Sequence, residues 1–447
     1  MQKCYQHHNA NELDACHQRV QYHYKQQKNA AGENVMSPTR MALLRATRWF
    51  PWIVLLCGGL VLSLNLGVRQ SLGLFIPDML NDTGWTASTF GLAFAIQNLM
   101  WGVSAPIAGA IADRFGTTRT LIGGAAIYAA GLYMMGTSSS PGELHLTAGF
   151  LIGTGVGTTS FPVILAAISR VFSPERRSFA LGIASAGGSV GQFVMAPTAQ
   201  MLNGSFGYIT TLMILAAIAM LMVPAAFALT GKAEGNSPTA APDLGPQGLM
   251  AAFHEARKHR GFMLLNAGFF VCGFHVAVVT THLPTFTALC GLPSSVAAEG
   301  LALIGLFNIF GTLTAGWAGG RFSKKFGLSF IYGMRAVVIL IFIFAPKTSE
   351  TILLFSATLG ALWLSTVPLT SGLIAQVFGP RYMATLFGIV MLSHQIGAFF
   401  GAWMGGIVYD MTGNFDAVWW VSVALGVFAA LVHMPIDDKE LRSTAKA

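Results

Sequence analysis

Two stretches of the chain are copies of one segment: VFSPERRSFALGIASAGGSVG at residues 171–191 and VFGPRYMATLFGIVMLSHQIG at residues 377–397. The Val-Phe-x-Pro start, the internal Gly-Ile and the final Gly coincide at a constant offset of 206 residues. A repeat of this length indicates two related halves, because self-similarity at a fixed period marks a repeated structural unit. We therefore predict a chain built from two halves of the same architecture.

The composition indicates the environment of these halves. Of the 447 residues, 53% are hydrophobic and only 10% are charged, whereas a soluble domain carries about 25% charged residues. The 51 glycines are about 11% of the 447 residues, compared with a usual share of about 7%. This excess suits closely packed membrane helices. A large soluble enzyme is excluded, and so is disorder of the whole chain. The five cysteines form neither a disulfide framework nor a paired zinc spacing.

Apolar runs recur from about residue 50 to residue 436. A helix needs about 20 such residues to cross a hydrocarbon core of ~30 Å. Lipid offers no partners to backbone groups, so the runs must be helices or barrel strands, and their length without alternation favours helices. We predict spans at 52–76, 88–111, 118–137, 145–170, 178–201, 207–229, 262–289, 297–318, 328–346, 350–375, 383–409 and 416–435. The predicted fold class is an all-α membrane protein with twelve transmembrane helices in two parallel six-helix repeats.

The charged residues predict the orientation, because cytoplasmic loops retain Lys and Arg. Of the 26 Lys and Arg residues, Arg69 and Arg335 fall well inside spans and Lys347 falls on the outer side. The others share one side with both termini, which we expect to be cytoplasmic in a multi-pass protein of the cytoplasmic (inner) membrane. Seven carboxylates fall on the opposite side: Asp78, Asp82, Glu143, Glu299, Glu350, Asp410 and Asp416. The net charge of +8 is thus a sign of topology, and no nucleic-acid partner is expected.

A long polar connection after the sixth span separates the halves. We predict a largely disordered cytoplasmic tail at 1–49, bundles at 50–230 and 261–436, a cytoplasmic linker at 231–260 and a second cytoplasmic tail at 437–447. The first tail is rich in His and Gln and contains no apolar core resembling a signal peptide. Its Cys and His residues match no zinc spacing, so we expect no bound metal.

One predicted cytoplasmic loop has the sequence GAIADRFGTTR at residues 109–119, and a degenerate copy lies at 316–325. The loop resembles the signature of the major facilitator superfamily, and this resemblance covers the chain after residue 50. It implies a two-half transporter that uses no nucleotide, and the sequence contains no GxxxxGK[ST] phosphate loop. The residues expected to form a gate between rocking halves are Gly109, Asp113, Arg114, Gly116, Arg119 and Arg321. The alternative is that these charges only fix topology.

The stretch 171–191 also resembles the fifth-helix signature of the monocarboxylate porter family, in its bacterial branch. Its basic pair, Arg176 and Arg177, is expected at the cytoplasmic mouth as part of the gate. The mammalian-type members of that family carry an Asp and an Arg one turn apart in helix eight. The aligned residues here are Asn308 and Thr312, so the charged pair is missing.

Arg69 is the leading candidate for substrate binding. It precedes Asp78 by nine residues, which places it roughly 13 Å below the outer boundary at 1.5 Å rise per residue. The carboxylates that touch predicted spans, Glu299, Glu350 and Asp416, lie only at the outer ends, so the planar guanidinium of Arg69 is available for a bound carboxylate. The alternative is that the side chain extends outward to Asp78.

Three histidines lie well inside spans, away from the span ends: His275, His282 and His394, the last followed by Gln395. An unperturbed pKa near 6.5 makes each a candidate proton carrier or carboxylate donor, while the alternative is a neutral packing histidine. His275 and His282 are two turns apart on one helix face, which we predict to line the cavity. Further candidates for substrate contact are the amides Asn65, Gln97, Gln192 and Asn308, together with Gln395.

These observations predict a secondary active transporter that moves a small organic anion, expected to be a monocarboxylate, by alternating access with proton coupling or exchange. The alternative hypothesis is proton-driven efflux of drugs or metabolites. It is disfavoured because such efflux usually requires a carboxylate inside the membrane. A non-transporting receptor is disfavoured because no sizeable soluble module is present. We expect no enzyme activity and no cofactor, because nucleophile, base and acid are not clustered. The expected partners are the anion, protons and lipid, and the expected state is a monomer.

Overall fold

The computed structural model describes residues 49–172, 174–229, 256–378 and 383–437. The chain divides into Met1–Phe50 and Pro51–Ala447, and the second unit holds the helices discussed below. Nearly all of the two predicted tails and most of the predicted linker lie outside the described residues. So do the side chains of residues 113, 174–179, 375, 378 and 383–385, which include the predicted gate residues Asp113, Arg176 and Arg177.

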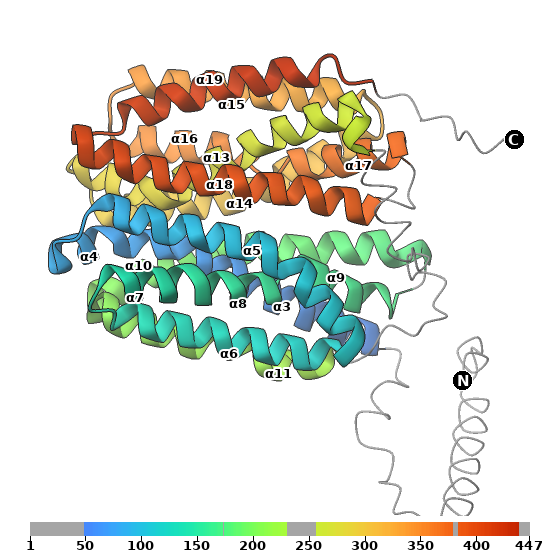
Figure 1. The fold of residues 1–447 in the computed structure, drawn as a ribbon, viewed down its shortest axis with the longest axis horizontal. Helices are drawn as coiled ribbons and strands as arrows, with labels where there is room; N and C mark the ends of the chain where they lie inside the picture. The colour runs from blue at the N-terminus through green and yellow to red at the C-terminus, as the bar shows by residue number, and fades with distance from the viewer. Residues whose placement is uncertain (1–48, 173, 230–255, 379–382, 438–447) are drawn as a thin grey trace, which may run out of the picture. The chain divides into compact units, whose positions relative to one another are not determined.

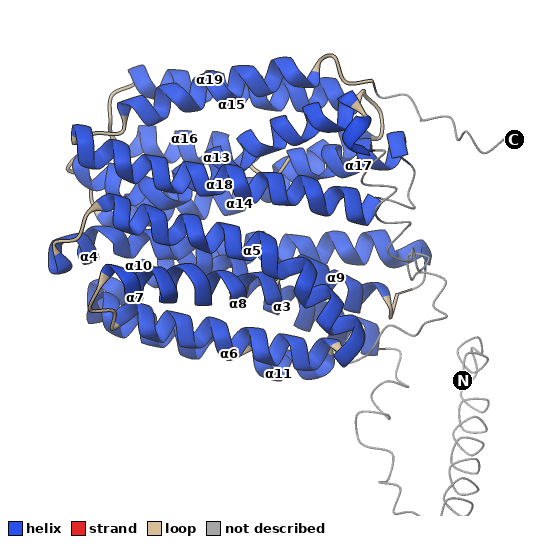
Figure 2. Cartoon of the chain, in the orientation of Figure 1, coloured by secondary structure: helices blue, strands red, loops and turns tan. Residues whose placement is uncertain are grey.

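The described chain is helical, with turns and loops between the helices (Figure 2). The first half contains α3 (Phe50–Ser71), η2 (Leu72–Phe75), α4 (Ile76–Thr83), α5 (Ala87–Phe115), α6 (Thr117–Gly136), α7 (Pro141–Leu144), the π-helical η3 (His145–Leu151), α8 (Ile152–Thr158), α9 (Phe161–Ser169), α10 (Pro174–Ala219) and α11 (Met222–Ala228). The second half contains α13 (Arg260–Leu289), α14 (Ser294–Gly319), α15 (Lys324–Phe344), α16 (Ser349–Ala361), α17 (Thr366–Phe378), α18 (Met383–Thr412) and α19 (Asp416–His433) (Figure 1).

Each predicted span coincides with a helix or with consecutive helices, and the all-α membrane fold is confirmed. Ten helices in the described chain are long and apolar enough to cross a membrane. The difference from twelve has two causes. Spans five and six form one element because the break at Gly207, whose φ of 75° is left-handed, interrupts α10 without ending it. The third span corresponds to α6, which is not one of the ten and begins with three threonines and Arg119.

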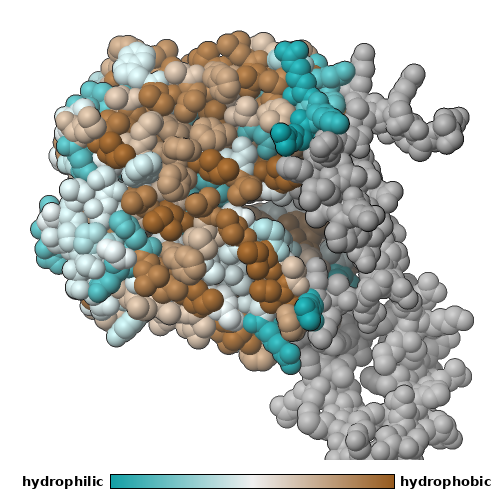
Figure 3. Space-filling model, in the orientation of Figure 1, coloured by the Kyte–Doolittle hydropathy of each residue, from teal (hydrophilic) through white to brown (hydrophobic). Residues whose placement is uncertain are grey.

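The two ends of the helical bundle differ in charge. One end, here called the acidic face, carries the carboxylates of Asp78, Asp82, Glu143, Glu299, Glu350, Asp410 and Asp416. The other end, here called the basic face, carries the loops α5–α6 and α14–α15 with Arg114, Arg119, Arg321, Lys324 and Lys325. Hydrophobic residues dominate the surface between the two ends (Figure 3). This distribution agrees with a multi-pass membrane protein, because lipid contacts the middle and water the ends.

The two halves meet closely at glycines toward the acidic face. A Cβ atom added to Gly91 of α5 would lie 2.7 Å from the carbonyl oxygen of Ala402 in α18. One added to Gly305 of α14 would lie 2.8 Å from the backbone nitrogen of Phe193 in α10. Only glycine permits backbones to approach this closely, and small residues are the usual means of packing membrane helices. The halves are therefore closed against each other on this side.

Three glycines toward the basic face are open. At Gly109, Gly182 and Gly388 an added Cβ atom would meet no described atom within 4 Å. Gly182 and Gly388 are equivalent positions of the repeat, so both copies of the segment show the same openness. Figure 3 shows a recess between the two halves on this side. The structure is thus closed toward the acidic face and open toward the basic face.

Two of the spans are broken at equivalent positions. Thr159 and Ser160 separate α8 from α9, and residues 362–365 separate α16 from α17. The repeat offset of 206 residues maps Thr159 onto Ser365. Irregular backbone at membrane depth is tolerated only where it is buried in protein or lines a cavity. The fourth helix of each half therefore has an interruption that the rest of its half must stabilise.

Candidate functional site

Arg69 lies in the last turn of α3, where the helix changes to the tighter η2. One Nη atom donates to Oδ1 of Asn98, and the guanidinium lies over the Trp101 ring at 4.8 Å from its centroid. Asn98 can accept this bond because its own Nδ2 donates to the carbonyl oxygen of Phe94 at 2.8 Å. The Nε atom is buried and has no partner in the described chain. Two neighbours therefore orient the cation without neutralising it.

No carboxylate of the described chain pairs with Arg69. Asp78, the partner in the alternative interpretation, instead accepts a hydrogen bond of 2.6 Å from Nδ2 of Asn203. The interpretation in which Arg69 extends outward to Asp78 is thus wrong for this structure. An unneutralised cation inside a membrane bundle is costly, and by default it is a functional hypothesis.

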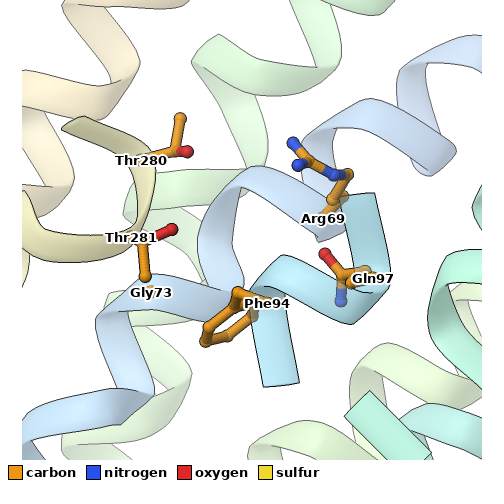
Figure 4. Close-up of a pocket in the computed structure, with 6 residues that line it drawn as sticks. All are labelled: Arg69, Gly73, Phe94, Gln97, Thr280 and Thr281. Atoms are coloured by element: carbon orange, nitrogen blue, oxygen red, sulfur yellow. The ribbon is translucent and has the colours of Figure 1, made fainter. Parts of the chain in front are cut away.

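Arg69 lines a pocket between the two halves (Figure 4). Its empty volume is about 230 Å³, including the part open to solvent. The lining residues are Arg69 and Gly73 from the first span, Phe94 and Gln97 from α5, and Thr280 and Thr281 from α13. The pocket thus combines one cation, one amide, two hydroxyls and one aromatic ring.

The floor of this pocket is formed by a close crossing of the halves. A Cβ atom added to Gly73 would collide with the carbonyl oxygen of Thr280, so η2 and α13 touch through their backbones. Nearby, Nε2 of Gln70 donates to the carbonyl oxygen of Leu301 at 2.9 Å. Both contacts connect the first half to the second. A ligand in the pocket would therefore touch both halves at once.

Gln97 is 1% exposed and projects from the middle of α5. Its Nε2 donates to the carbonyl oxygen of Ala148 at 2.8 Å, within the π-helical η3. In Figure 4 its oxygen points toward the side of the pocket where Arg69 lies. Of the predicted substrate contacts, Arg69 and Gln97 are the two that the structure brings together at the pocket.

The predicted histidines do not line this pocket. Nε2 of His275 lies 2.8 Å from the carbonyl oxygen of Ser422, and Nε2 of His282 lies 2.8 Å from that of Ala402. Both rings are almost fully buried and pack against α19 and α18 within the second half. In this structure the two rings contact different helices of the second half and do not line the pocket, contrary to the prediction. The correction arises because backbone carbonyls of neighbouring helices satisfy these rings.

His394 and Gln395 are buried side chains of α18. The His394 ring centroid is 5.3 Å from that of Phe269, and neither ring nitrogen has a hydrogen-bond partner in the described chain. The Cβ and Cγ atoms of Gln395 lie against Gly102, where an added Cβ atom would be 3.0 Å from each. Gln395 thus contributes to the contact of α18 with α5, and neither residue lines the pocket.

Asn65 has a structural role at the break between α8 and α9. Its Nδ2 donates to the carbonyl oxygen of Val156 at 2.9 Å and to the hydroxyl of Thr159. In the second half, Arg335 donates to the carbonyl oxygen of Leu362 from Nε and Nη2, at 3.1 and 2.6 Å. Val156 and Leu362 are equivalent at the 206-residue offset. Each half therefore caps the same carbonyl group with a different buried side chain.

Asn308 and Gln192 lie where α10 meets α14. Nδ2 of Asn308 donates to the Ser189 hydroxyl at 2.9 Å, and its Oδ1 accepts from the backbone nitrogen of Leu364 at 3.0 Å. Gln192 is 8% exposed, and its Cβ is 2.9 Å from where a Gly305 Cβ would lie. Both residues join the halves in this state and do not line the pocket.

Three of the predicted gate residues, Arg114, Arg119 and Arg321, are exposed on the basic face. Gly116 follows the last residue of α5 and has a φ of 98°. A positive φ favours glycine, which explains the glycine at this position of the loop. Arg114 lies over the ring of its neighbour Phe115, and Arg321 lies over Trp317 at 4.4 Å from the ring centroid. Arg119 is exposed, and Gly109 is open. Each of these two cation–π contacts lies within one half of the described chain.

Sequence reasoning missed Thr280, Thr281, Phe94 and Trp101. A threonine or an aromatic ring in an apolar run gives no signal by itself, since such residues usually pack or bond within their own helix. Thr280, for example, donates to the carbonyl oxygen of Val276 at 2.9 Å. Their place at the pocket follows only from the crossing of the two halves.

Two six-helix repeats that enclose a small polar pocket, closed on one side and open on the other, define a membrane transporter of the alternating-access class. The chain belongs to the Major Facilitator Superfamily, whose family model matches residues 55–360 and 300–447. The resemblance seen in the loop at 109–119 is thereby confirmed, as is the expectation of a transporter rather than an enzyme.

Individual relatives agree with this assignment. The chain is similar to "Monocarboxylate transporter 11" of Mus musculus, at 26% identity over 400 residues and 86% of each chain. It is similar to "Monocarboxylate transporter 13" of Rattus norvegicus, at 25% identity, covering 86% of this chain and 89% of the relative. A solved bacterial homologue of the human lysosomal transporter Spinster, in an inward-facing and occupied conformation, has a TM-score of 0.68 at 16% identity. That match covers 87% of this chain and 97% of the other, and it confirms the fold.

Proposed function

We propose that this protein is a secondary transporter of a small monocarboxylate. The carrying observation is Arg69, a cation with no carboxylate partner in the described chain, placed on a small pocket between the halves. The names of the relatives, monocarboxylate transporters 11 and 13, support the same substrate class. The residues that line the pocket include no carboxylate, which disfavours the drug-efflux alternative.

In this proposal Arg69 binds the substrate carboxylate through its remaining N–H groups. Asn98 and Trp101 hold the guanidinium in place, so little side-chain freedom is lost when the anion binds. Phe94 contacts the apolar part of the substrate, while Thr280 and Thr281 reach it from the second half. Because both halves touch the bound anion, the anion can stabilise the occluded state through which the halves must pass.

The transport cycle is proposed to couple the anion to protons or to exchange of a second anion. The candidate proton carriers inside the bundle are His275, His282 and His394, none of which touches the pocket in this state. A role for them would require the state open to the acidic face. We further propose that the basic face is cytoplasmic, that the protein lies in the cytoplasmic membrane and that it acts as a monomer.

Uptake into proteoliposomes tests the substrate proposal. Labelled lactate, pyruvate and propionate would be offered under a pH gradient to the purified, reconstituted protein. We expect uptake that Arg69→Ala abolishes, because the carboxylate then loses its only cationic partner in the pocket. The matched control is Lys347→Ala, which removes one positive charge at the acidic face, where Nζ bonds only to backbone carbonyls such as that of Phe342 at 2.8 Å.

Two results would contradict the proposal. One is the absence of uptake of all three acids by folded, reconstituted protein. The other is uptake by Arg69→Ala that equals the uptake by Lys347→Ala at the same protein content, which would remove Arg69 from the binding site.

A further inference from the structure

The amide of Gln97 has a fixed orientation. Its Nε2 donates to the carbonyl oxygen of Ala148 at 2.8 Å. The reverse orientation would place the amide oxygen against that carbonyl oxygen, so the hydrogen-bond network assigns the amide. The Oε1 atom has no donor in the described chain, yet it is not among the completely enclosed unpaired atoms. It therefore offers a free acceptor to the pocket that Arg69 also lines.

The backbone around Gln97 is held closely. A Cβ atom added to Gly153 would lie 2.5 Å from the carbonyl oxygen of Gln97, and one added to Gly149 would lie 3.0 Å from the Ile96 side chain. Two glycines thus bring the fourth span against α5 at this level. The π-helical turn η3 supplies the Ala148 carbonyl that fixes the amide. Since π-helical turns are frequent at functional sites, this geometry points to a positioned side chain.

The other polar groups of the pocket do not require a hydrogen-bond donor on the ligand. Arg69 only donates hydrogen bonds. The hydroxyls of Thr280 and Thr281 can accept or donate, because a hydroxyl proton rotates to suit its partner. Gln97 Oε1 is therefore the one pocket side-chain atom among the described residues that accepts and cannot donate. A substrate that lies between Arg69 and Gln97 needs an acceptor at one end and a donor at the other.

We propose that Gln97 selects monocarboxylates that carry a hydroxyl group beside the carboxylate over those that carry a ketone there. This inference rests on the proposed function, because it assumes a carboxylate on Arg69. A 2-hydroxy acid places its carboxylate on the guanidinium and donates its hydroxyl hydrogen to Oε1. A 2-oxo acid places a second acceptor against Oε1, and neither oxygen is then satisfied. An unsubstituted acid places its carboxylate on Arg69 but has neither a hydroxyl nor a ketone to face Oε1.

The test compares KM values of lactate, pyruvate and propionate for Arg69-dependent uptake by the reconstituted protein. For the unchanged chain we expect the KM of lactate to be about tenfold lower than that of pyruvate, the usual effect of one buried hydrogen bond gained or left unmade. For Gln97→Met, which keeps the length of the side chain without the amide, we expect a lactate-to-pyruvate ratio near one. The Tm of Gln97→Met in detergent, compared with that of the unchanged chain, reports whether the variant is folded.

The outcomes separate the two proposals. No uptake of any acid by the unchanged chain overturns the proposed function and this inference with it. Uptake of all three without a preference for lactate overturns this inference alone. A preference that persists in Gln97→Met also overturns it. If Gln97→Met fails to fold, the lactate preference of the unchanged chain still tests this inference. Gln97→Asn then serves as the second variant. There the shortened amide cannot bridge Ala148 and substrate, so the preference should fall.

Discussion

At the scale of single residues, the position of Arg69 explains why a cation is retained in an apolar helix. Its contacts with Asn98 and Trp101 satisfy part of the guanidinium, and Arg69 lines the pocket without a carboxylate partner in the described chain. Arg335, the other arginine inside a span, donates instead to the backbone carbonyls of Leu362 and Trp363. Two arginines that look alike in the sequence thus differ in their partners, and only one of them is available to a ligand.

Replacing Trp101 tests how much the orientation of Arg69 matters. A cation–π contact contributes about 0.5–2 kcal/mol, and its loss in Trp101→Leu would let the guanidinium move away from its binding position. We expect KM for the carboxylate to rise about two- to tenfold with a smaller change in kcat. The control is Trp420→Leu, an exposed tryptophan of α19, for which KM should stay unchanged. Equal KM values in the two variants would exclude an orienting role for Trp101.

At the scale of helices, the broken spans show how a repeat preserves a feature with different residues. Val156 and Leu362 are equivalent, and their carbonyl groups are released where the helices break. Asn65 caps the first from α3, while Arg335 caps the second from α15. Buried backbone groups without partners are costly in a membrane protein. The polar caps are therefore a structural requirement of the breaks, which accounts for two polar residues that do not touch the pocket.

Removing either cap should destabilise the protein without removing the pocket. Asn65→Ala leaves the Val156 carbonyl unsatisfied, and Arg335→Met leaves those of Leu362 and Trp363 unsatisfied. We expect each change to cost about 1–3 kcal/mol of stability. Thermal unfolding in detergent would show this as a lower Tm. The control is Arg321→Met, an arginine exposed on the basic face, and a Tm for either cap variant equal to that of this control would refute the role.

The spans could be predicted from the sequence because lipid permits few alternatives to a long apolar helix. The breaks could not be seen in the apolar runs, although Pro162 and Pro368 follow them at the 206-residue offset and indicate their position. Arg69 and Gln97 could be predicted as pocket residues because a charge or an amide is conspicuous in an apolar run. The prediction that the histidines line the cavity was wrong for this structure. The helical period shows which residues share a face of a helix, but it does not show which neighbouring helix packs against that face.

At the scale of the whole molecule, the two halves are joined by contacts that differ between the two faces. On the acidic face, the Asp410 carboxylate of α18 accepts hydrogen bonds of 2.8 Å from the backbone nitrogens of Ala87 and Ser88. These nitrogens begin α5, where a carboxylate is favoured by the helix dipole. Gly406, one turn earlier, allows the same helices to touch, since its added Cβ would lie 2.5 Å from the carbonyl oxygen of Ala87. Asp410 therefore fastens the closed side of the transporter.

Loss of this contact should shift the protein toward the state open to the acidic face. In Asp410→Ala the first turn of α5 loses its carboxylate while the packing at Gly406 is unchanged, so the closed state is selectively weakened. A Thr281→Cys substitution reports on the pocket through its rate of modification by a membrane-impermeant maleimide added at the acidic face. We expect faster modification in Asp410→Ala than in the parent. Asp416→Ala, a change on the same face that removes no contact across the halves, is the control, and equal rates in all three proteins would show that Asp410 does not hold this side closed.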